Sequence, residues 1–195
     1  MTTTPVLATR REQILQEAVD LVASSGYDKL TMRAVARASG IKLGALQYHF
    51  PTRHDLLRGL ASYVAEAYRD SFDAFQADLP GGGASVQELV QFLMEDAAGH
   101  RLQADRLFPQ LWAMSLVEPI MEELMDNLYD EYLEKLAEML ERRGAQRPRA
   151  EAIVVMAMVD GLTLFTGDGR RWAARGPEVT RAVFDLIEQR YGHDE

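Results

Sequence analysis

Cysteine is absent from this chain of 195 residues. Its absence excludes a disulfide framework and any zinc site built on thiolates, and it fits a reducing compartment. Long apolar runs without charge are also missing, and residues 1–6 lack the apolar core of a signal peptide. We therefore expect a cytoplasmic protein with no membrane span. The apolar share, 47%, is sufficient for a hydrophobic core.

Basic residues are scarce, since 21 Lys and Arg stand against 30 Asp and Glu, for a formal net charge of −9. Such a charge argues against nucleic-acid binding, because phosphates attract cations. The distribution changes this interpretation. Residues 1–60 hold eight basic and five acidic residues, a net of +3, whereas the rest of the chain carries −12. A basic head (residues 1–60) on an acidic body (residues 61–195) indicates that the N-terminal end of the chain faces DNA.

Alternating patterns of β-branched residues are lacking as well. Apolar residues recur at helical spacing along most of the chain, so the sequence predicts an all-α fold. Three helix starts carry capping residues, namely Thr31 alone and the capping boxes of Thr52 with Asp55 and Ser85 with Glu88. The expected helices are a long one from residue 52, one from residue 85, and others at about residues 10–24, 32–38, 42–49, 103–117, 119–144, 148–166 and 177–191. A break between helices is expected at residues 80–83.

Residues 31–57 have the spacing of a helix-turn-helix: a short helix, a turn at Ser39 and Gly40, a second short helix and a capped long helix. In this motif the second helix lies in the major groove while the first braces it. Leu46 and Phe50, four residues apart, are expected to bury the back of the second helix. Its opposite face then offers Lys42, Leu43, Gly44, Ala45, Gln47, Tyr48 and His49 to DNA.

The side chains on that face differ in what they can bind. Gln47 can make a bidentate contact with adenine. Gly44 and Ala45 are small enough to let the helix backbone approach the base edges. Phosphate oxygens suit Lys42, Tyr48, His49 and, beyond the helix, Arg53. Arg33 and Arg37 on the preceding helix are equally consistent with DNA contact and with solvated surface charge.

The runs LTMRAVA at residues 30–36 and IKLGALQYHFPTR at residues 41–53 are similar to the DNA-binding domain of the tetracycline-repressor (TetR) family. The resemblance covers residues 10–57, and the chain length and helix order also fit the family. It implies a DNA-binding domain at residues 1–55 and a ligand-binding and dimerisation domain at residues 56–195. It further implies a homodimer that represses from a pseudo-palindromic operator and is released by a small molecule.

The positions at which this family touches DNA correspond here to Thr31, Lys42, Gly44, Ala45, Tyr48, His49 and Arg53. Arg33, Leu43 and Gln47 complete the predicted DNA-binding set. Gln47 is a departure, because the family often has an aromatic residue at that position. The body adds a second likeness, since Leu111-Trp112-Ala113 and Glu118-Pro119 resemble the bodies of regulators of the betaine type.

Residues 153–159, IVVMAMV, are apolar all round, so this helix must bury two faces. One face belongs to the chain's own core, and the other, with the last helix, is the expected seam of a homodimer. A central helix buried in a monomer is the alternative. The predicted dimer residues are Val155, Met158, Val159, Leu162, Val179, Val183, Leu186 and Ile187.

A pocket for a small effector is expected in the body. Methionine and aromatic side chains form adaptable apolar cavities, although they also form ordinary cores. The large apolar body favours an apolar or aromatic effector. The candidate pocket residues are Met94, Phe108, Trp112, Met114, Met125, Tyr129 and Phe165.

Other function classes find less support. No nucleophile or carboxylate partner accompanies His49 in a recognisable motif, so we predict no catalytic residue and no enzyme of the helical-bundle type. Asp96 and His100 are four residues apart but lack the further ligands of a helical-bundle metal site, so neither a metal nor a cofactor is expected. An architectural protein that binds any duplex remains the alternative, and the acidic body argues against it.

Overall fold

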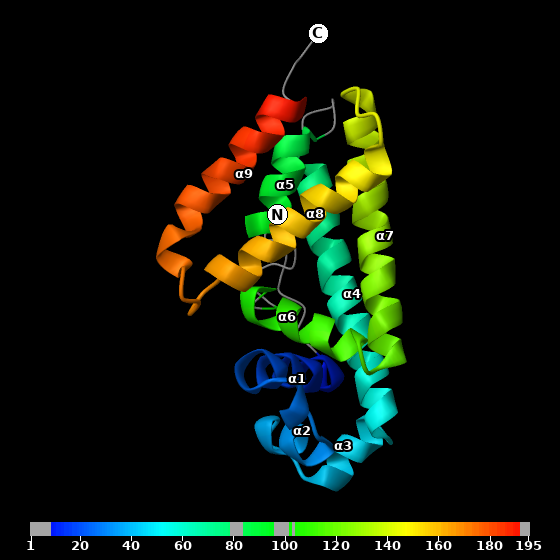
Figure 1. Cartoon of the computed structure of the whole chain (residues 1–195). Coiled ribbons are helices and arrows are strands. Elements are labelled where there is room, and N and C mark those ends of the chain that lie inside the picture. Colours follow the sequence, from blue (N-terminus) through cyan, green and yellow to red (C-terminus); the bar gives the residue numbers. More distant parts are fainter. Residues whose placement is uncertain (1–8, 79–83, 96–101, 103, 192–195) are drawn as a thin grey trace, which may run out of the picture.

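The computed structural model describes residues 9–78, 84–95, 102 and 104–191 (Figure 1). Within these ranges the chain is built of α-helices and two single-turn 3-10 helices without a β-strand, which confirms the all-α prediction. The elements are α1 (Arg10–Ser25), η1 (Tyr27–Lys29), α2 (Met32–Ala38), α3 (Leu43–His49), α4 (Arg53–Ala77), α5 (Val86–Glu95), α6 (Ala104–Ser115), α7 (Pro119–Arg142), α8 (Pro148–Thr166), η2 (Ala173–Arg175) and α9 (Gly176–Tyr191).

Two predictions fall on parts of the chain that are not described. The break at residues 80–83 and the pair Asp96 and His100 both lie outside the described residues. Of the described helices, none combines the length and the apolar character needed to cross a membrane.

The helix starts follow the predicted capping chemistry. At α4, Thr52 Oγ1 accepts a hydrogen bond from the backbone N–H of Asp55, and Asp55 Oδ2 accepts one from the backbone N–H of Thr52, both at 3.1 Å. Ser85 and Glu88 repeat this exchange at α5, at 3.1 and 2.8 Å. Thr31 Oγ1 accepts a backbone N–H of the first turn of α2 at 3.2 Å. These bonds satisfy N–H groups that have no partner within the helix, which fixes where each helix begins.

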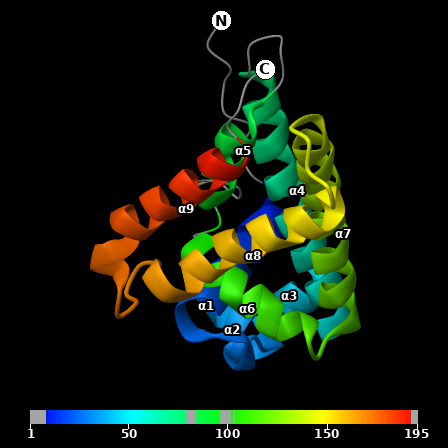
Figure 2. The same ribbon diagram turned by 45° about the horizontal axis from the view of Figure 1, so that its top comes forward.

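The helices form a small N-terminal cluster and a larger body (Figures 1 and 2). The cluster consists of α1, α2 and α3 at one end of the molecule. α4 begins in this cluster and continues for 25 residues into the body, where it packs against α7. The predicted domain boundary between residues 55 and 56 therefore falls inside the first turns of an unbroken helix. The division into two domains stays a prediction.

Further contacts between helices organise the body. α6 lies between α1 on one side and α7 and α8 on the other. α7 and α8 pack against each other, and α9 packs against both α5 and α8 along the outer edge (Figures 1 and 2). α6 is therefore a helix of the body that packs directly against the N-terminal cluster.

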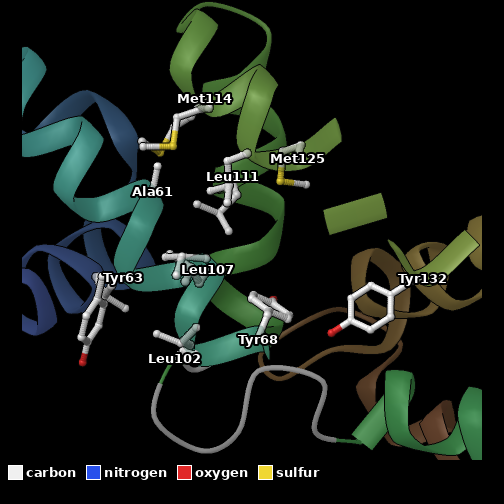
Figure 3. Packing of buried hydrophobic residues seen from close by; sticks show 14 of the residues in the cluster. Ala61, Tyr63, Tyr68, Leu102, Leu107, Leu111, Met114, Met125 and Tyr132 are labelled. Atoms are coloured by element: carbon white, nitrogen blue, oxygen red, sulfur yellow. The ribbon is translucent and has the colours of Figure 1, made fainter. Parts of the chain in front are cut away.

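One continuous hydrophobic core runs through both parts, from Ile14 in α1 to Ile187 in α9. Figure 3 shows a section of it, where buried side chains of α4, α6 and α7 meet. Met114 and Met125, two of the predicted pocket residues, belong to this core and are only 0% and 2% exposed. Their place is within the packed body, and neither lines the cavity between α6 and α8 described below.

Candidate nucleic-acid interface and ligand pocket

The turn between α2 and α3 depends on a glycine. Gly40 has a φ of +65°, in the left-handed region that a Cβ atom disfavours. Its N–H donates to the Arg37 carbonyl at 3.1 Å, and the N–H of Ile41 donates to the Ala36 carbonyl at 2.9 Å. This is the Schellman arrangement of a helix end. Arg10 of α1 donates to the carbonyl that precedes Gly40, at 2.9 Å, so α1 holds the turn in place.

α3 has one buried face and one exposed face. Leu46 and Phe50 are 0% exposed, which confirms the predicted buried face. Tyr48 is 85% exposed, and its ring forms a T-shaped pair with the His49 ring at a centroid distance of 5.4 Å. Of the predicted DNA-binding residues, Thr31, Arg33, Lys42, Gly44, Ala45, Gln47, Tyr48 and Arg53 are exposed, and Leu43 and His49 are partly buried. Tyr48 and Gln47 on an exposed helix face are suited to contact with a nucleic-acid groove rather than to burial in a protein core.

The back of α3 is held by two other helices. A Cβ atom on Gly59 of α4 would lie 2.7 Å from Phe50 Cε1, so the backbone of α4 packs directly against the Phe50 ring. The guanidinium of Arg11, on α1, lies 4.7 Å from the centroid of the same ring. Phe50 is thus enclosed between α1 and α4, and α3 presents its exposed face from a fixed base.

Arg53, at the start of α4, makes bonds that its predicted role did not include. Its Nη1 lies 2.7 Å from Glu118 Oε1 and its Nη2 donates to Tyr27 Oη at 2.5 Å. Tyr27 Oη in turn donates to Glu118 Oε1. The Tyr27 hydrogen bond, together with the Arg53 guanidinium, lowers the pKa of Glu118 below its ordinary value. The group joins the N-terminal cluster to the residue that precedes α7, and we refer to it as the Arg53–Glu118–Tyr27 cluster.

α6 carries a second link to the N-terminal cluster. Gln110 Oε1 accepts a hydrogen bond from the backbone N–H of Tyr27 at 3.1 Å. Tyr27 therefore takes part in both links, through its backbone to α6 and through its side chain to Glu118. A displacement of α6 would act on η1 directly.

A cavity of about 330 Å³ lies between α6 and α8. Its volume falls in the range of small-molecule sites. Phe108 and Trp112, two of the predicted pocket residues, line it, and Tyr129 of α7 bonds to its wall. The lining residues are Phe108, Pro109, Trp112, Ala157, Asp160, Gly161, Thr163 and Leu164.

Asp160 is the ionisable residue among the described residues of this cavity, and sequence reasoning missed it. The Tyr129 hydroxyl donates to Asp160 Oδ2 at 2.6 Å, and Trp112 Nε1 donates to the Tyr129 oxygen at 3.0 Å. Burial raises the pKa of Asp160 to about 6, against the opposing effect of the Tyr129 hydrogen bond. The available signal was a single acidic residue directly after the apolar run 153–159.

The other predicted pocket residues lie elsewhere. Phe165 is 57% exposed and lines a neighbouring groove of about 510 Å³ between α8 and α9. Met94, in α5, is partly buried against the hydrophobic core. The structure therefore brings Phe108, Trp112 and Tyr129 together, and the other four predicted pocket residues are not among the described residues that line this cavity.

The predicted dimer residues divide between the inside and the outside of the chain. Val155, Val159, Val183 and Ile187 are buried by the chain itself, so they have little surface left for a partner. Met158, Leu162 and Val179 are partly buried, and Leu186 is 55% exposed. Sequence reasoning missed the outward apolar residues of α8, because periodicity alone does not say which side of an all-apolar helix the chain covers. These residues are Ile153, Val154, Leu164 and Phe165, each more than half exposed.

No group of three or more acidic or histidine residues that could hold a metal ion occurs in the described part of the chain.

Two family matches cover most of the chain. Residues 14–60 match the family described as bacterial regulatory proteins, tetR family, and residues 84–187 match the C-terminal part of BetI-type transcriptional repressors. The HTH-type transcriptional regulator BetI of Serratia proteamaculans (strain 568) is 25% identical over 181 residues, which cover 89% of this chain and 85% of the relative. The chain spans 66%, just under two thirds, of the length of three mycobacterial HTH-type regulators that it matches at 22% identity. These relatives are regulators rather than enzymes.

Solved structures share the fold. A transcriptional regulator from Rhodococcus sp. Rha1 aligns with a TM-score of 0.74 at 22% identity, over 94% of this chain and 96% of that one. A regulator from Saccharomonospora viridis, solved in complex with choline, aligns with a TM-score of 0.70 at 23% identity, over 91% of this chain and 95% of that one.

Proposed function

The chain belongs to the TetR family of bacterial regulatory proteins and is a transcriptional regulator with a helix-turn-helix DNA-binding domain, and from this premise we propose that it is a dimeric repressor that a small molecule releases from a palindromic operator. The observation that carries the proposal is the two-sided α3, whose buried face is fixed by α1 and α4 while its exposed face bears Gln47 and Tyr48. Binding to the chromosome places the protein in the cytoplasm.

On the operator, α3 lies in the major groove. Gln47 faces a base edge and reads adenine, while Lys42 and Tyr48 contact phosphates on either side. The small residues Gly44 and Ala45 let the helix backbone come close to the bases. Apart from its own helix, no described residue has an atom within 4 Å of a Cβ added at Gly44. The positive head and the negative body orient the molecule, because the body is repelled by the duplex.

A palindromic operator requires two copies of α3 about one helical turn, ~34 Å, apart. We place the dimer contact on the outward face of α8 and α9, where Val154, Leu164, Phe165 and Leu186 are more than half exposed. Isolated exposed apolar residues are ordinary, but a group on two adjacent helices is typical of an interface. The buried predicted residues support this face from within the chain.

Release depends on α6, which has a different neighbour on each side. Phe108 and Trp112 line the cavity, whereas Gln110 binds the backbone of Tyr27 and the helix packs on α1. A ligand that binds the cavity better in one conformer shifts the population towards it. We infer that this conformer displaces α6 and swings α4, so that the two copies of α3 no longer fit successive major grooves.

The DNA-binding proposal is tested by selecting duplexes from a random pool with purified protein, at near-physiological salt because weak phosphate contacts mislead at low salt. We expect an enriched inverted repeat. Gln47→Ala should relax the preference at one base pair by about 1–3 kcal/mol, whereas Tyr48→Ala should weaken all duplexes about equally. Gln87→Ala, on the exposed face of α5, is the matched control. No enrichment, even after unfolding and refolding to remove a bound ligand, would contradict sequence-specific binding.

The dimer contact is tested by sedimentation of a charged variant. Val154→Glu puts a carboxylate into the proposed contact and should yield monomers, because an unpaired charge is not tolerated in an apolar interface. Val117→Glu is the matched control, since Val117 is 65% exposed in the segment between α6 and α7. A Val154→Glu protein that remains dimeric would move the interface elsewhere.

A further inference from the structure

We propose that the effector of this protein is an organic cation, bound in the cavity between α6 and α8 with the Asp160 carboxylate as its counter-charge. The inference rests on the proposed function, because it names the chemical class of that effector. It differs from the apolar or aromatic effector that the composition of the body suggests.

The charge of the cavity favours a cation. Among the described residues that line it, Asp160 is the one acidic side chain and none is basic. No ion pair within the described residues includes Asp160. Arg106, the basic residue of α6 with a described side chain, is paired with Asp168 at 2.6 Å. A partly buried carboxylate without a cation is unfavourable unless something compensates it. A cationic ligand would provide that compensation.

The second carboxylate oxygen is open to the cavity. Oδ2 is occupied by the Tyr129 hydroxyl at 2.6 Å, and no further hydrogen bond to Asp160 is found in the described residues. Among those residues, the one buried side-chain polar atom without a partner is Ser39 Oγ. Asp160 Oδ1 is therefore accessible, and Asp160 lines the cavity. Tyr129 fixes the carboxylate in position, and its other oxygen can meet a ligand.

Two aromatic side chains, Phe108 and Trp112, line the same cavity as the carboxylate. The centroid of Tyr129 lies 5.4 Å from that of Trp112 and 6.1 Å from that of Phe108. The faces of such rings attract cations, and ammonium ligands are recognised by groups of aromatic rings. The rest of the lining is apolar or small, including Leu164 and Gly161. The combination suits an ammonium or similar cation attached to an apolar group.

Binding should depend on pH through one residue. Tyr129 faces Asp160 from α7, and the charge of Asp160 also reaches Tyr68 of α4. Burial is the main cause that raises the pKa of both hydroxyls well above the ordinary range. Both tyrosines are therefore neutral at physiological pH. Asp160, whose pKa burial raises to about 6, becomes neutral in mildly acidic solution. Cation binding should then be full above this pH and decline below it.

The test uses benzyltrimethylammonium and its neutral carbon isostere, neopentylbenzene, titrated calorimetrically into the full-length protein. We expect the cation to bind the wild-type chain and Asp160→Asn to weaken it by about tenfold or more, since a charge-assisted contact is lost. The same substitution should not weaken the isostere. Asp126→Asn, on the exposed face of α7, removes the same charge away from the cavity and should leave binding unchanged.

Three outcomes would overturn the inference: a wild-type chain that does not bind the cation, an Asp160→Asn chain that binds it as well as wild type, or an isostere that matches the cation in both proteins. Fluorescence of Trp112, measured in a Trp172→Phe background that removes the second tryptophan, reports whether the probe reaches the cavity. Operator selection is independent of this titration. A protein that selects an inverted repeat but ignores the cation refutes the effector class alone, and one that selects no repeat refutes the proposed function.

Discussion

Asp160→Asn should make the folded protein more stable at neutral pH, even though it removes the feature proposed to bind the effector. Asparagine keeps an oxygen that can accept the Tyr129 hydroxyl hydrogen bond, and it carries no charge. The change therefore isolates the free-energy cost of holding a carboxylate in the cavity. Functional sites often contain such unfavourable groups.

The magnitude follows from the pKa of Asp160. Burial raises it from 3.8 to about 6 in the folded chain, so the protonated form is favoured there. The unfolded chain releases this proton at lower pH, so the free energy of unfolding falls as pH rises between about 4 and 6 and is then constant. At 1.36 kcal/mol per pKa unit, the free energy of unfolding decreases by at most about 3 kcal/mol over this pH range. Contact of the carboxylate with solvent in the cavity reduces this decrease towards about 1 kcal/mol.

The assay is urea unfolding of both proteins at a fixed protein concentration, because dimerisation would make stability depend on concentration. The free energies of unfolding should be nearly equal near pH 4 and should differ by about 1–3 kcal/mol in favour of Asp160→Asn at pH 7. Asp126→Asn, which removes one carboxylate at an exposed position, is the matched control. A difference that does not change with pH, or a wild-type chain that is more stable at pH 7, would refute the assigned cause.

Three further changes test other parts of the structure. Gly59→Ala places a methyl group 2.7 Å from Phe50 Cε1. This overpacking should lower the free energy of unfolding by about 1–3 kcal/mol. An unchanged melting temperature would show that Phe50 can move aside. Thr52→Ala removes the capping box of α4 and should cost about 1 kcal/mol in urea unfolding, with Thr52→Ser restoring most of it; equal losses for both would exclude the cap as the cause. Glu118→Gln removes the ion pair of Arg53 and leaves its guanidinium free to contact a phosphate. The slope of log affinity for the operator against log salt concentration should then steepen by about one phosphate contact. An unchanged slope means that Arg53 does not reach the DNA.

Local features of the fold could be predicted from the sequence because their causes are local. The start of α4 follows from Thr52 and Asp55, which lie three residues apart and bond to each other. The turn before α3 follows from Gly40, since few other residues accept its backbone conformation. The buried side of α3 follows from the spacing of Leu46 and Phe50 along one helix face.

The features that could not be predicted depend on contacts between distant residues. Arg53 and Glu118 are 65 positions apart, so nothing near Arg53 in the sequence indicates that its guanidinium is already paired. Asp160 reaches its partner Tyr129 across 31 positions. On α8, an unbroken apolar run hides the fact that Val155 faces the core while Val154 faces outward. In each case the side that a residue faces is decided by packing rather than by its neighbours in sequence.

The packing of Phe50 against Gly59 also determines where this chain can be joined to part of another regulator. A chimaera joined at the capping box would pair the α3 of one protein with the α4 of another, and most side chains at position 59 would collide with the Phe50 ring. The exchangeable unit is therefore longer than the sequence motif. It includes the first two turns of α4, and a junction beyond Leu60 would let a designer give this body a new operator without disturbing the contacts that hold α3 in place.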